Sequence, residues 1–242
     1  MFRGFVVTGT DTDVGKTFTT AALSLWLQAK GLDIVPMKPV QTGAKPMSDG
    51  LRAPDLDFTL GVLDHVPSPD ERDLMQPFCY IPACSPHLAV AEDEIAPSVE
   101  AIVGAAEELE RRHPAVVIEG AGGLMVPLNR REMMIDLFAA LNLPVVLVGR
   151  VGLGTINHVL LSIDALKSRH IPVAGVILNE TRPQGPDDAF IRADNPHTIA
   201  HFGGVPCFGT LPFIPEPTIA KLLAAANGLS GLDVAFAHLL AR

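Results

Sequence analysis

The sequence is poor in cysteine and in basic side chains. Three cysteines among 242 residues cannot build a disulfide framework, and an odd number of them is typical of a reducing compartment. Lysine and arginine number 18 against 27 aspartates and glutamates, so the formal net charge is −9. Because neutralising phosphates requires a surplus of basic residues, we expect no nucleic-acid partner and no anionic membrane surface. A local basic pocket for one anionic ligand is still compatible with this charge.

Long apolar runs are also missing. No segment reaches the about 20 uninterrupted apolar residues that a membrane span needs. At the N-terminus, Thr8, Asp11 and Asp13 interrupt the apolar residues before the hydrophobic region of a signal peptide could form. We therefore expect a cytoplasmic protein. Hydrophobic residues make up 48% of the chain and no shift in composition marks a linker, so residues 1–242 are predicted to form a single domain.

Short apolar runs alternate with helical patterns over most of the chain. The runs are rich in valine and isoleucine, which is typical of strands that are covered on both faces. Helices are predicted at residues 16–30, after an N-cap at Ser98, and after an N-cap at Thr155. This order predicts an α/β fold with a mostly parallel central sheet flanked by helices. The predicted strands are residues 5–8, 34–37, 115–118, 145–148, 173–178 and 205–209.

One stretch departs from the alternation. Residues 36–97 contain ten of the 21 prolines. Within them, residues 64–90 are predicted to be a loop, and a loop of that length in a compact domain is usually functional or mobile. The sequence does not indicate what this segment does.

The strongest motif is the segment from Gly9 to Thr17, Gly-Thr-Asp-Thr-Asp-Val-Gly-Lys-Thr. It follows the first predicted strand and opens the first predicted helix, where backbone N–H groups and the positive helix end point at one place. Lys16 can reach terminal phosphates, and the Thr17 hydroxyl can bind Mg²⁺. The spacing is unusual, because Thr10 takes the place of the first glycine of the common nucleotide-binding motif. We predict a nucleotide-binding loop.

Two further strand ends carry charge. Glu119 ends a buried strand and precedes a glycine-rich run, so it can hold Mg²⁺ at the edge of the sheet where ligands of open α/β folds bind, or it can simply cap a helix. Lys38 ends the second predicted strand and could stabilise the charge that develops during phosphoryl transfer. Asp55 begins the next predicted helix, either as a cap or as another carboxylate near the metal.

Together these segments resemble the dethiobiotin synthetase family of ATP-dependent enzymes. The resemblance implies a P-loop NTPase-like fold that uses MgATP, CO₂ and 7,8-diaminopelargonate. It implies that a substrate amine forms a carbamate, that the carbamate takes the γ-phosphoryl group, and that the second amine closes a cyclic urea. It also implies a homodimer with active sites near the subunit interface. The segments that carry it are residues 7–17, 38–40, 51–55, 85–87, 119–123, 152–158 and 179, with a weaker match at 211–213.

The resemblance further implies a role for individual residues. Lys16, Lys38 and Thr12 would act in catalysis. Mg²⁺ would be held by Thr17, Asp55 and Glu119. The substrate would be bound by Thr12, Lys38, Thr42, Gly154 and Asn157, the last two from the second subunit. ATP and its metal ion would contact Asp13, Val14, Gly15, Lys16, Thr17, Phe18, Asp55, Glu119, Gly120, Ala121, Gly122, Asn179, Pro212, Phe213 and Glu216.

The chain departs from the family pattern at two positions. It has Asp13 where the family often has glutamate, and Thr42 where the family often has serine, which keeps the hydroxyl. The main alternative is a dimeric ATPase switch of the partitioning or iron-protein type, but such loops carry an extra lysine early, and residues 10–12 contain none. Another ATP-dependent amidating or cyclising enzyme of the same superfamily is a third interpretation.

Overall fold

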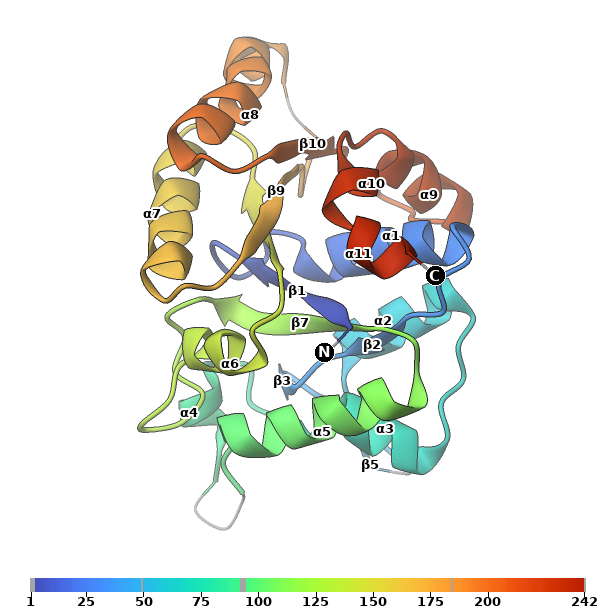
Figure 1. Cartoon of the computed structure of the whole chain (residues 1–242). Coiled ribbons are helices and arrows are strands. Elements are labelled where there is room, and N and C mark those ends of the chain that lie inside the picture. Colours follow the sequence, from blue (N-terminus) through green and yellow to red (C-terminus); the bar gives the residue numbers. More distant parts are fainter. Residues whose placement is uncertain (1–2, 49, 92–94, 184, 242) are drawn as a thin grey trace.

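The structure is a computed structural model that describes residues 3–48, 50–91, 95–183 and 185–241. Strands and helices alternate along the chain, and the helices surround a central sheet (Figure 1). The elements are β1 (Gly4–Gly9), α1 (Lys16–Ala29), β2 (Val35–Met37), β3 (Val40–Thr42), β4 (Lys45–Met47), β5 (Gly50–Arg52), α2 (Pro54–Leu63), α3 (Pro69–Met75), β6 (Phe78–Tyr80), α4 (Pro86–Ala89), α5 (Val99–Arg112), β7 (Val116–Gly123), α6 (Met134–Leu141), β8 (Val145–Arg150), α7 (Thr155–Ser168), β9 (Val173–Asn179), the 3-10 helix η1 (Pro186–Asp188), α8 (Ala189–Gly203), β10 (Cys207–Leu211), α9 (Ile219–Asn227), α10 (Leu232–Ala235) and α11 (Ala237–Leu240).

The central sheet has six strands in the order β10-β9-β8-β1-β7-β2. Every neighbouring pair in it is parallel, and in the register of the central strands Val6 lies between Ile118 of β7 and Val145 of β8. The predicted α/β fold with a parallel sheet is therefore confirmed. Because all six strands run the same way, their carboxyl ends meet at one edge, where ligands of such folds bind.

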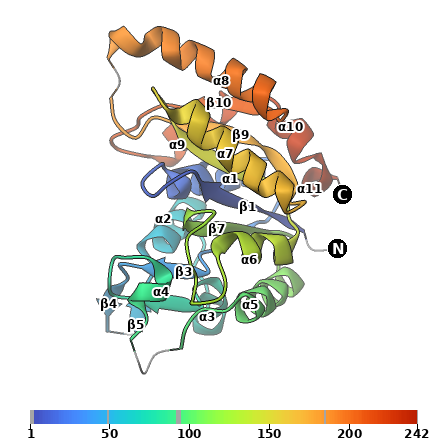
Figure 2. The ribbon, with the colours of Figure 1, turned by 90° about the vertical axis from the view of Figure 1, so that its left-hand side faces the viewer.

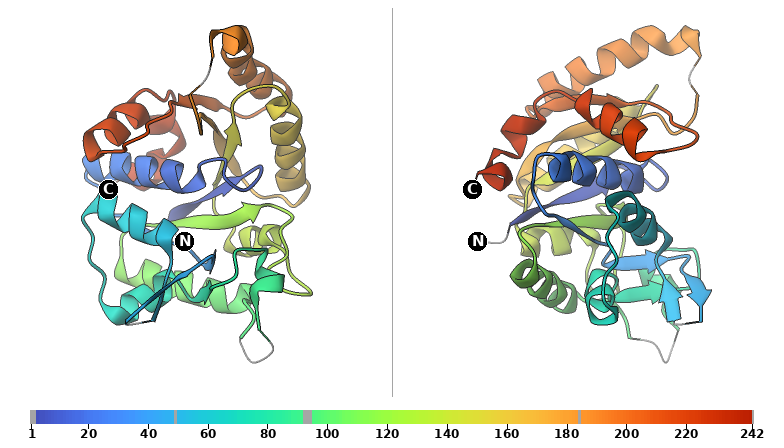
Figure 3. Two further views of the ribbon diagram at one scale, coloured as in Figure 1. Left: turned by 180° about the vertical axis from the view of Figure 1, so that it is seen from behind. Right: turned by 90° about the vertical axis from the view of Figure 1, so that its right-hand side faces the viewer.

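The side chains of β1 alternate between two apolar layers. Phe5 and Val7 pack with α1, α9 and the C-terminal helices, whereas Val6 packs with the layer formed by α5 and α6. The Phe5 ring lies 4.7 Å from that of Phe236, and both are fully buried. Figure 3 shows α1 between the red C-terminal helices and the teal α2 on the first face. Burial on both faces is what the continuous apolar strands predict.

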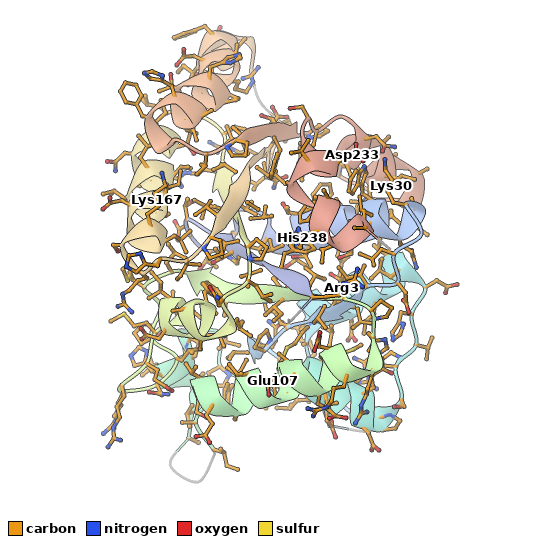
Figure 4. All side chains as sticks on the ribbon, in the orientation of Figure 1. Arg3, Lys30, Glu107, Lys167, Asp233 and His238 are labelled. Carbon is orange, nitrogen blue, oxygen red and sulfur yellow. The ribbon has the colours of Figure 1, made fainter. Side chains whose placement is uncertain are left out.

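Contacts of the C-terminal helices join the end of the chain to its N-terminal part. The Arg3 guanidinium donates a hydrogen bond of 2.8 Å to the carbonyl oxygen of Leu239. Lys30 and Asp233 form an exposed ion pair of 2.9 Å between α1 and α10 (Figure 4). No helix among the described residues is long and apolar enough to cross a bilayer.

The prediction of a loop over residues 64–90 is wrong. This segment contains α3, β6 and α4, and Figure 2 shows α4 grouped with β3, β4 and β5 beside one end of the sheet. Pro69 and Pro86 each occupy the first turn of a helix, where a missing N–H costs nothing. Ser68 and Glu71 form a reciprocal capping box at the start of α3. These two prolines therefore mark helix starts rather than unstructured chain.

The predicted cap at Ser98 is confirmed, since its hydroxyl accepts a hydrogen bond from the Ala101 N–H. The predicted starts of another helix and of the last strand differ from the structure. Thr155, in contrast, is the first residue of α7, and the N-cap is Gly154 with a left-handed φ of 89°. The last strand lies two residues later than predicted, beginning at Cys207, because Val205 belongs to the turn that follows α8.

Candidate active site

The loop between β1 and α1 is held in shape by a distant strand. Gly15 is the N-cap of α1 and has φ of 94°, a left-handed conformation that favours glycine. A β-carbon on it would lie 1.9 Å from Nδ2 of Asn179, at the end of β9. The same Nδ2 donates a hydrogen bond of 3.1 Å to the carbonyl of Val14. Asn179 therefore fixes the part of the loop from which α1 starts, with the backbone N–H groups of that start free to meet an anion.

Lys16 is buried in this loop with only 7% of its surface exposed. Its ammonium donates a hydrogen bond of 2.8 Å to the carbonyl of Asp11, and this keeps the side chain folded over the loop. Burial, together with the positive charge of Lys38, lowers the pKa of Lys16 to about 8. The loop thus holds a cation whose charge an incoming phosphate would stabilise.

Lys38 lies at the centre of a charged cluster at the end of β2. Its Nζ is 2.7 Å from Oδ2 of Asp55 and 2.7 Å from Oε1 of Glu119, and the side chain is almost fully buried. Burial alone would lower the pKa of Lys38, but the carboxylates of Glu119 and Asp55 outweigh it and raise that pKa. Thr17 donates a hydrogen bond of 2.8 Å to the same Oε1 of Glu119. Residues from α1, α2 and β7 and from the end of β2 therefore converge here.

The oxygen atoms of this cluster fit a magnesium ion. The carboxylates of Asp55 and Glu119 flank the Lys38 ammonium, and the Thr17 hydroxyl is hydrogen-bonded to the Glu119 carboxylate. Oxygen ligands of this kind suit Mg²⁺ when nucleotide phosphates complete the set. Within the described residues, no group of three or more His, Cys, Asp or Glu side chains is arranged to hold a metal. The predicted metal residues are thus adjacent to one another and need a phosphate to complete coordination.

A cavity of about 720 Å³ opens beside the cluster. Its volume suits a substrate together with the end of a nucleotide, since ligand pockets usually measure about 300–1,000 Å³. Gly122 has a left-handed φ of 65°, and a β-carbon on it would lie 2.8 Å from the side chain of Val126, so this position of the wall favours glycine. The lining residues are Thr12, Asp13, Gly15, Lys16, Thr17, Lys38, Val40, Gln41, Thr42, Asp55, Ala83, Cys84, Ser85, Pro86, Glu119, Ala121, Gly122 and Val126.

A second cavity of about 210 Å³ meets the same loop from the other side. It shares Gly15 with the larger cavity, so one extended ligand could reach both. The Oδ1 atom of Asn179 is buried there and has no hydrogen-bond partner among the described residues. Such an acceptor suits an amino group on a planar base. The lining residues are Gly15, Phe18, Asn179, Glu180, Thr181, Pro212, Phe213 and Ile214.

Most of the residues singled out from the sequence line these two cavities, but five do not: Val14, Gly120, Gly154, Asn157 and Glu216. Glu216 is exposed and lines neither cavity, and its carbonyl accepts a hydrogen bond from Lys221. Gly154 and Asn157 are exposed at the start of α7, also outside both cavities. Gly120 lies behind the cavity wall and accepts a hydrogen bond of 3.4 Å from Lys38 through its carbonyl.

Several lining residues carried no signal of their own in the sequence. Gln41 and Cys84 belong to short segments without a chemical motif, and Glu180 only follows Asn179. The backbone N–H of Phe213 donates to Glu180 at 3.4 Å, so that carboxylate fixes the loop after β10. Gln41 lies on β3, which pairs with β6 outside the central sheet, so the strand pattern of the central sheet does not identify it.

The chain resembles known proteins over nearly its full length. Residues 3–220 match the model of a protein family described as an AAA domain. The chain is 39% identical over 236 residues to the ATP-dependent dethiobiotin synthetase BioD of Anaeromyxobacter sp. (strain K), covering 97% of this chain and 100% of that relative. It is 40% identical over 217 residues to the protein of the same name from Halalkalibacterium halodurans, covering 89% and 87%.

Solved structures of low sequence identity share the fold. The MinC:MinD cell division protein complex of Aquifex aeolicus matches with a TM-score of 0.57 at 14% identity, covering 92% of this chain and 86% of that one. A ParA family ATPase from Chlorobium tepidum TLS matches with a TM-score of 0.51 at 15% identity, covering 99% and 95%. At these identities the likeness shows the fold alone, whereas the curated relatives are similar in sequence from end to end. The chain therefore belongs to the ATP-dependent dethiobiotin synthetase family.

Proposed function

We propose that the chain catalyses ATP-dependent closure of a cyclic urea from 7,8-diaminopelargonate and CO₂, releasing ADP and phosphate. One observation carries this proposal: the buried Lys38 ammonium lies between two carboxylates at the wall of a cavity that also contains the phosphate-binding loop. Lys16 lies in the same wall, so two cations face one enclosed volume. Phosphoryl transfer needs such fixed positive charge around the moving group.

The proposed chemistry proceeds in three balanced steps. One substrate amine attacks CO₂ and loses a proton, giving a carbamate. A carbamate oxygen then attacks the γ-phosphorus of ATP, and the bond to the bridging oxygen breaks to release ADP. The second amine finally attacks the carbamoyl carbon, loses a proton and expels phosphate as the ring closes. Phosphorylation is required because an oxide is a poor leaving group and phosphate is a good one.

The residues of the larger cavity divide into two roles in this scheme. The backbone from Asp13 to Phe18 and the Lys16 ammonium bind the triphosphate, consistent with a left-handed Gly15 at the helix start. Lys38 stabilises the negative charge shared between the γ-phosphate and the carbamate. Thr12 and Thr42 also line this cavity, and their hydroxyls would hydrogen-bond the amines or the carbamate.

Mg²⁺ is part of the proposal. Thr17, Asp55 and Glu119 would hold the ion, which when bound neutralises phosphate charge in the way such ions do in other phosphoryl-transfer enzymes. Ala121 and Gly122 line the wall next to Glu119 and leave room for a phosphate. Supporting this assignment, the Asp55 and Glu119 carboxylates each lie 2.7 Å from the Lys38 ammonium, and the Thr17 hydroxyl is hydrogen-bonded to the Glu119 carboxylate.

The smaller cavity is proposed to bind adenine. Asn179 offers a buried acceptor, and the ring of Phe213 with Pro212 offers apolar walls. Glu216 is not supported as a contact by its exposed position, so the role that the family resemblance implies for it remains a proposal without support from this geometry.

We further propose a homodimer that works in the cytoplasm as one domain per chain. Gly154 and Asn157 are exposed at the start of α7, away from the cavity of their own subunit, which agrees with their serving the substrate of a partner. A sheet whose strands come from residues 4–211 supports one domain. The free thiols of all three cysteines agree with a reducing compartment.

The alternative of a dimeric ATPase switch is not favoured. The MinD and ParA structures share the fold but only 14% and 15% of the sequence, and the loop here has no lysine at residues 10–12. A switch would also have no use for a substrate cavity next to Lys38.

The test is direct. Purified protein is incubated with MgATP, ¹⁴C-bicarbonate and 7,8-diaminopelargonate, and the product is examined for label in a cyclic urea. We expect labelled dethiobiotin and ADP in equal amounts, with ATP turnover absent when the diamine is omitted. Turnover that is independent of the diamine and increases with a partner protein would instead support the switch.

A further inference from the structure

The helix that carries Asp55 lacks its own cap. At the start of α2 the N-cap residue is Ala53, which has no side chain able to accept a hydrogen bond, and Pro54 follows it without an N–H group. Ala53 is fully buried, so its own backbone N–H needs an acceptor within the protein. An unpaired buried N–H is costly, so another part of the chain has to accept a hydrogen bond from Ala53 just before the helix starts.

Gln76 is the residue that binds it. Its side-chain Oε1 accepts a hydrogen bond of 3.2 Å from the N–H of Ala53, and its Nε2 donates one of 2.8 Å to the carbonyl of Leu51. The two bonds hold the backbone on both sides of Arg52, immediately before α2 begins. They use both ends of the amide, so its orientation is fixed by its partners.

The residue before Gln76 also holds the backbone of Lys38, at the centre of the charged cluster. The carbonyl of Met75 accepts a hydrogen bond of 2.8 Å from the backbone N–H of Lys38. Met75 itself is fully buried, so this contact point is rigidly packed. Two consecutive residues at the end of α3 therefore set the backbone positions of Lys38 and of the helix that presents Asp55.

Further contacts make α3 a firm support for this arrangement. Arg72 forms an ion pair of 2.6 Å with Asp57, on the first turn of α2. On the neighbouring residue of α3, Oε1 of Glu71 lies 3.0 Å from the Nε2 of His65 and 2.9 Å from that of His113. Through these contacts, α3 is tied to the first turn of α2, to the residue that follows the C-cap of α2, and to the C-cap of α5.

We propose that Gln76 is a positioning residue for the reaction: its amide sets the start of α2 so that the Asp55 carboxylate meets Lys38 and the metal ion. This inference rests on the proposed function, because it assigns the metal to Asp55. It also gives a role to the proline-rich segment between residues 64 and 90, which the sequence left unexplained. Gln76 lines neither cavity and touches no reacting group, so its effect passes through the backbone of α2.

The chain provides a matched control for the test. Gln28 on α1 donates a hydrogen bond of 3.2 Å from its Nε2 to the carbonyl of Leu63, at the opposite end of α2. Gln28→Ala and Gln76→Ala both remove a glutamine amide from the backbone of the same helix. Only the second should move Asp55.

The experiment measures binding of Mn²⁺ by electron paramagnetic resonance in the presence of a non-hydrolysable ATP analogue. Gln76→Ala and Gln76→Met should raise the Mn²⁺ dissociation constant about five- to tenfold, since partners outside the first ligand shell commonly change metal affinity by about tenfold or more. Gln76→Glu, which keeps the acceptor for Ala53 but loses the donor, should raise it roughly twofold. Gln28→Ala should leave it unchanged, and Asp55→Asn gives the size of the effect when the carboxylate itself is removed.

A purely structural role for Gln76 predicts another pattern. Thermal unfolding of each variant would then show reduced stability, while the folded protein would bind Mn²⁺ as the wild type does. Equal Mn²⁺ affinity in wild type, Gln76→Ala and Gln76→Met, or an equal loss in Gln28→Ala, overturns the inference. If the two apolar variants do not fold, a wild-type affinity in Gln76→Glu overturns it. Failure of the wild type to bind Mn²⁺ with the analogue would instead overturn the proposed metal site.

Discussion

The two buried lysines of the site lie in opposite electrostatic surroundings. Lys16, in the loop after β1, donates a hydrogen bond to a neutral carbonyl, and burial and the nearby Lys38 lower its pKa to about 8 against the opposing effect of Glu119, Asp55 and Asp13. Lys38, at the end of β2, lies between the carboxylates of Asp55 and Glu119, which raise its pKa in spite of burial. A bound phosphate would therefore balance the positive charge of Lys16, whereas the carboxylates of Asp55 and Glu119 already balance that of Lys38.

This difference predicts different roles for the two lysines, Lys16 in nucleotide binding and Lys38 in phosphoryl transfer. A cation without a carboxylate partner gains most from an incoming triphosphate, so Lys16 should contribute to nucleotide affinity. Lys38 is already paired and gains little from the ground state, so its contribution should concern the charge that shifts during phosphoryl transfer. The predictions below test this division, from the largest expected effect to the smallest.

Lys38→Ala should reduce formation of dethiobiotin at least about 1,000-fold, because a fixed cation at the transferring group is lost. Affinity for the nucleotide should change only a few-fold. Lys16→Ala should also abolish turnover but should weaken the nucleotide at least tenfold, since the charged hydrogen bond to the phosphates is removed. Labelled product formation and calorimetric titration with an ATP analogue measure the two effects. Equal loss of nucleotide affinity in both variants would remove the distinction between the two lysines.

Thr17→Val should raise the Mg²⁺ concentration needed for half-maximal turnover about tenfold, because one oxygen ligand is lost and the Glu119 carboxylate loses its 2.8 Å hydrogen bond. Thr20→Val is the matched control on the same helix. Thr20 is buried and its hydroxyl has no hydrogen-bond partner among the described residues. Its replacement should not change the metal requirement. Chelation of all divalent metal should stop both enzymes, and continued turnover in excess chelator would refute the metal assignment.

Nucleotide binding should take up protons near pH 8. The pKa of Lys16 is lowered to about 8 in the free protein, so close to half of these side chains are neutral there, and a bound triphosphate would restore the charge. Calorimetry in buffers of different ionisation enthalpy should therefore report an uptake of about half a proton at pH 8 and almost none at pH 6. The Lys16→Met variant should lose this uptake. An uptake that persists in the variant would assign it to another group.

The same pKa makes a prediction for folding. Lysine keeps its proton up to pH 10.5 in the unfolded chain and only to about pH 8 at position 16 of the folded one. Between these values the unfolded state binds more protons, so this residue makes the free energy of unfolding rise with pH across that window. Denaturant titrations of wild type and Lys16→Met at pH 7.5 and 9.5 should differ in that direction, with the smaller rise in the variant.

The smallest effect is expected far from the site. Lys30 and Asp233 form an exposed ion pair, and the ammonium of Lys30 also lies 5.0 Å above the ring of Trp26. Asp233→Ala should lower the free energy of unfolding by less than about 1 kcal/mol, because solvent screens the pair. Turnover should be unchanged, as Figure 4 places both residues on the surface over α1 and α10. A loss of activity would mean that the C-terminal helices influence the site in a way that the described contacts do not explain.

Much of the fold follows from local patterns. The strands read as apolar runs because both faces of the sheet are covered, and Ser98 marks a helix start by a hydroxyl that caps its own N–H groups. The segment between residues 64 and 90 could not be read in this way. Its helices are short and begin with proline, and the pairing of β6 with β3 joins residues almost forty positions apart. Patterns of composition do not contain such pairings.

The site shows the same division. The loop from Gly9 to Thr17 is one contiguous segment, so its motif can be recognised from the sequence alone. The cluster around Lys38 depends on residues from β2, α2 and β7, and only the shared edge of a parallel sheet brings them within 2.7 Å. Gln76 was beyond prediction, since a side chain that binds the backbone of another segment carries no sequence signature.

The close approach of Gly15 and Asn179 has a consequence for the kinetics of the enzyme. The Asn179 side chain at the end of β9 fills the space beside Gly15 and donates a hydrogen bond to the carbonyl of Val14, and β9 is anchored inside the sheet. Under the proposed function, ATP would meet a turn that is already held in place, so we expect little further ordering cost at this position. The speed of capture should accordingly depend on diffusion and ionic strength rather than on a preceding rearrangement of the turn.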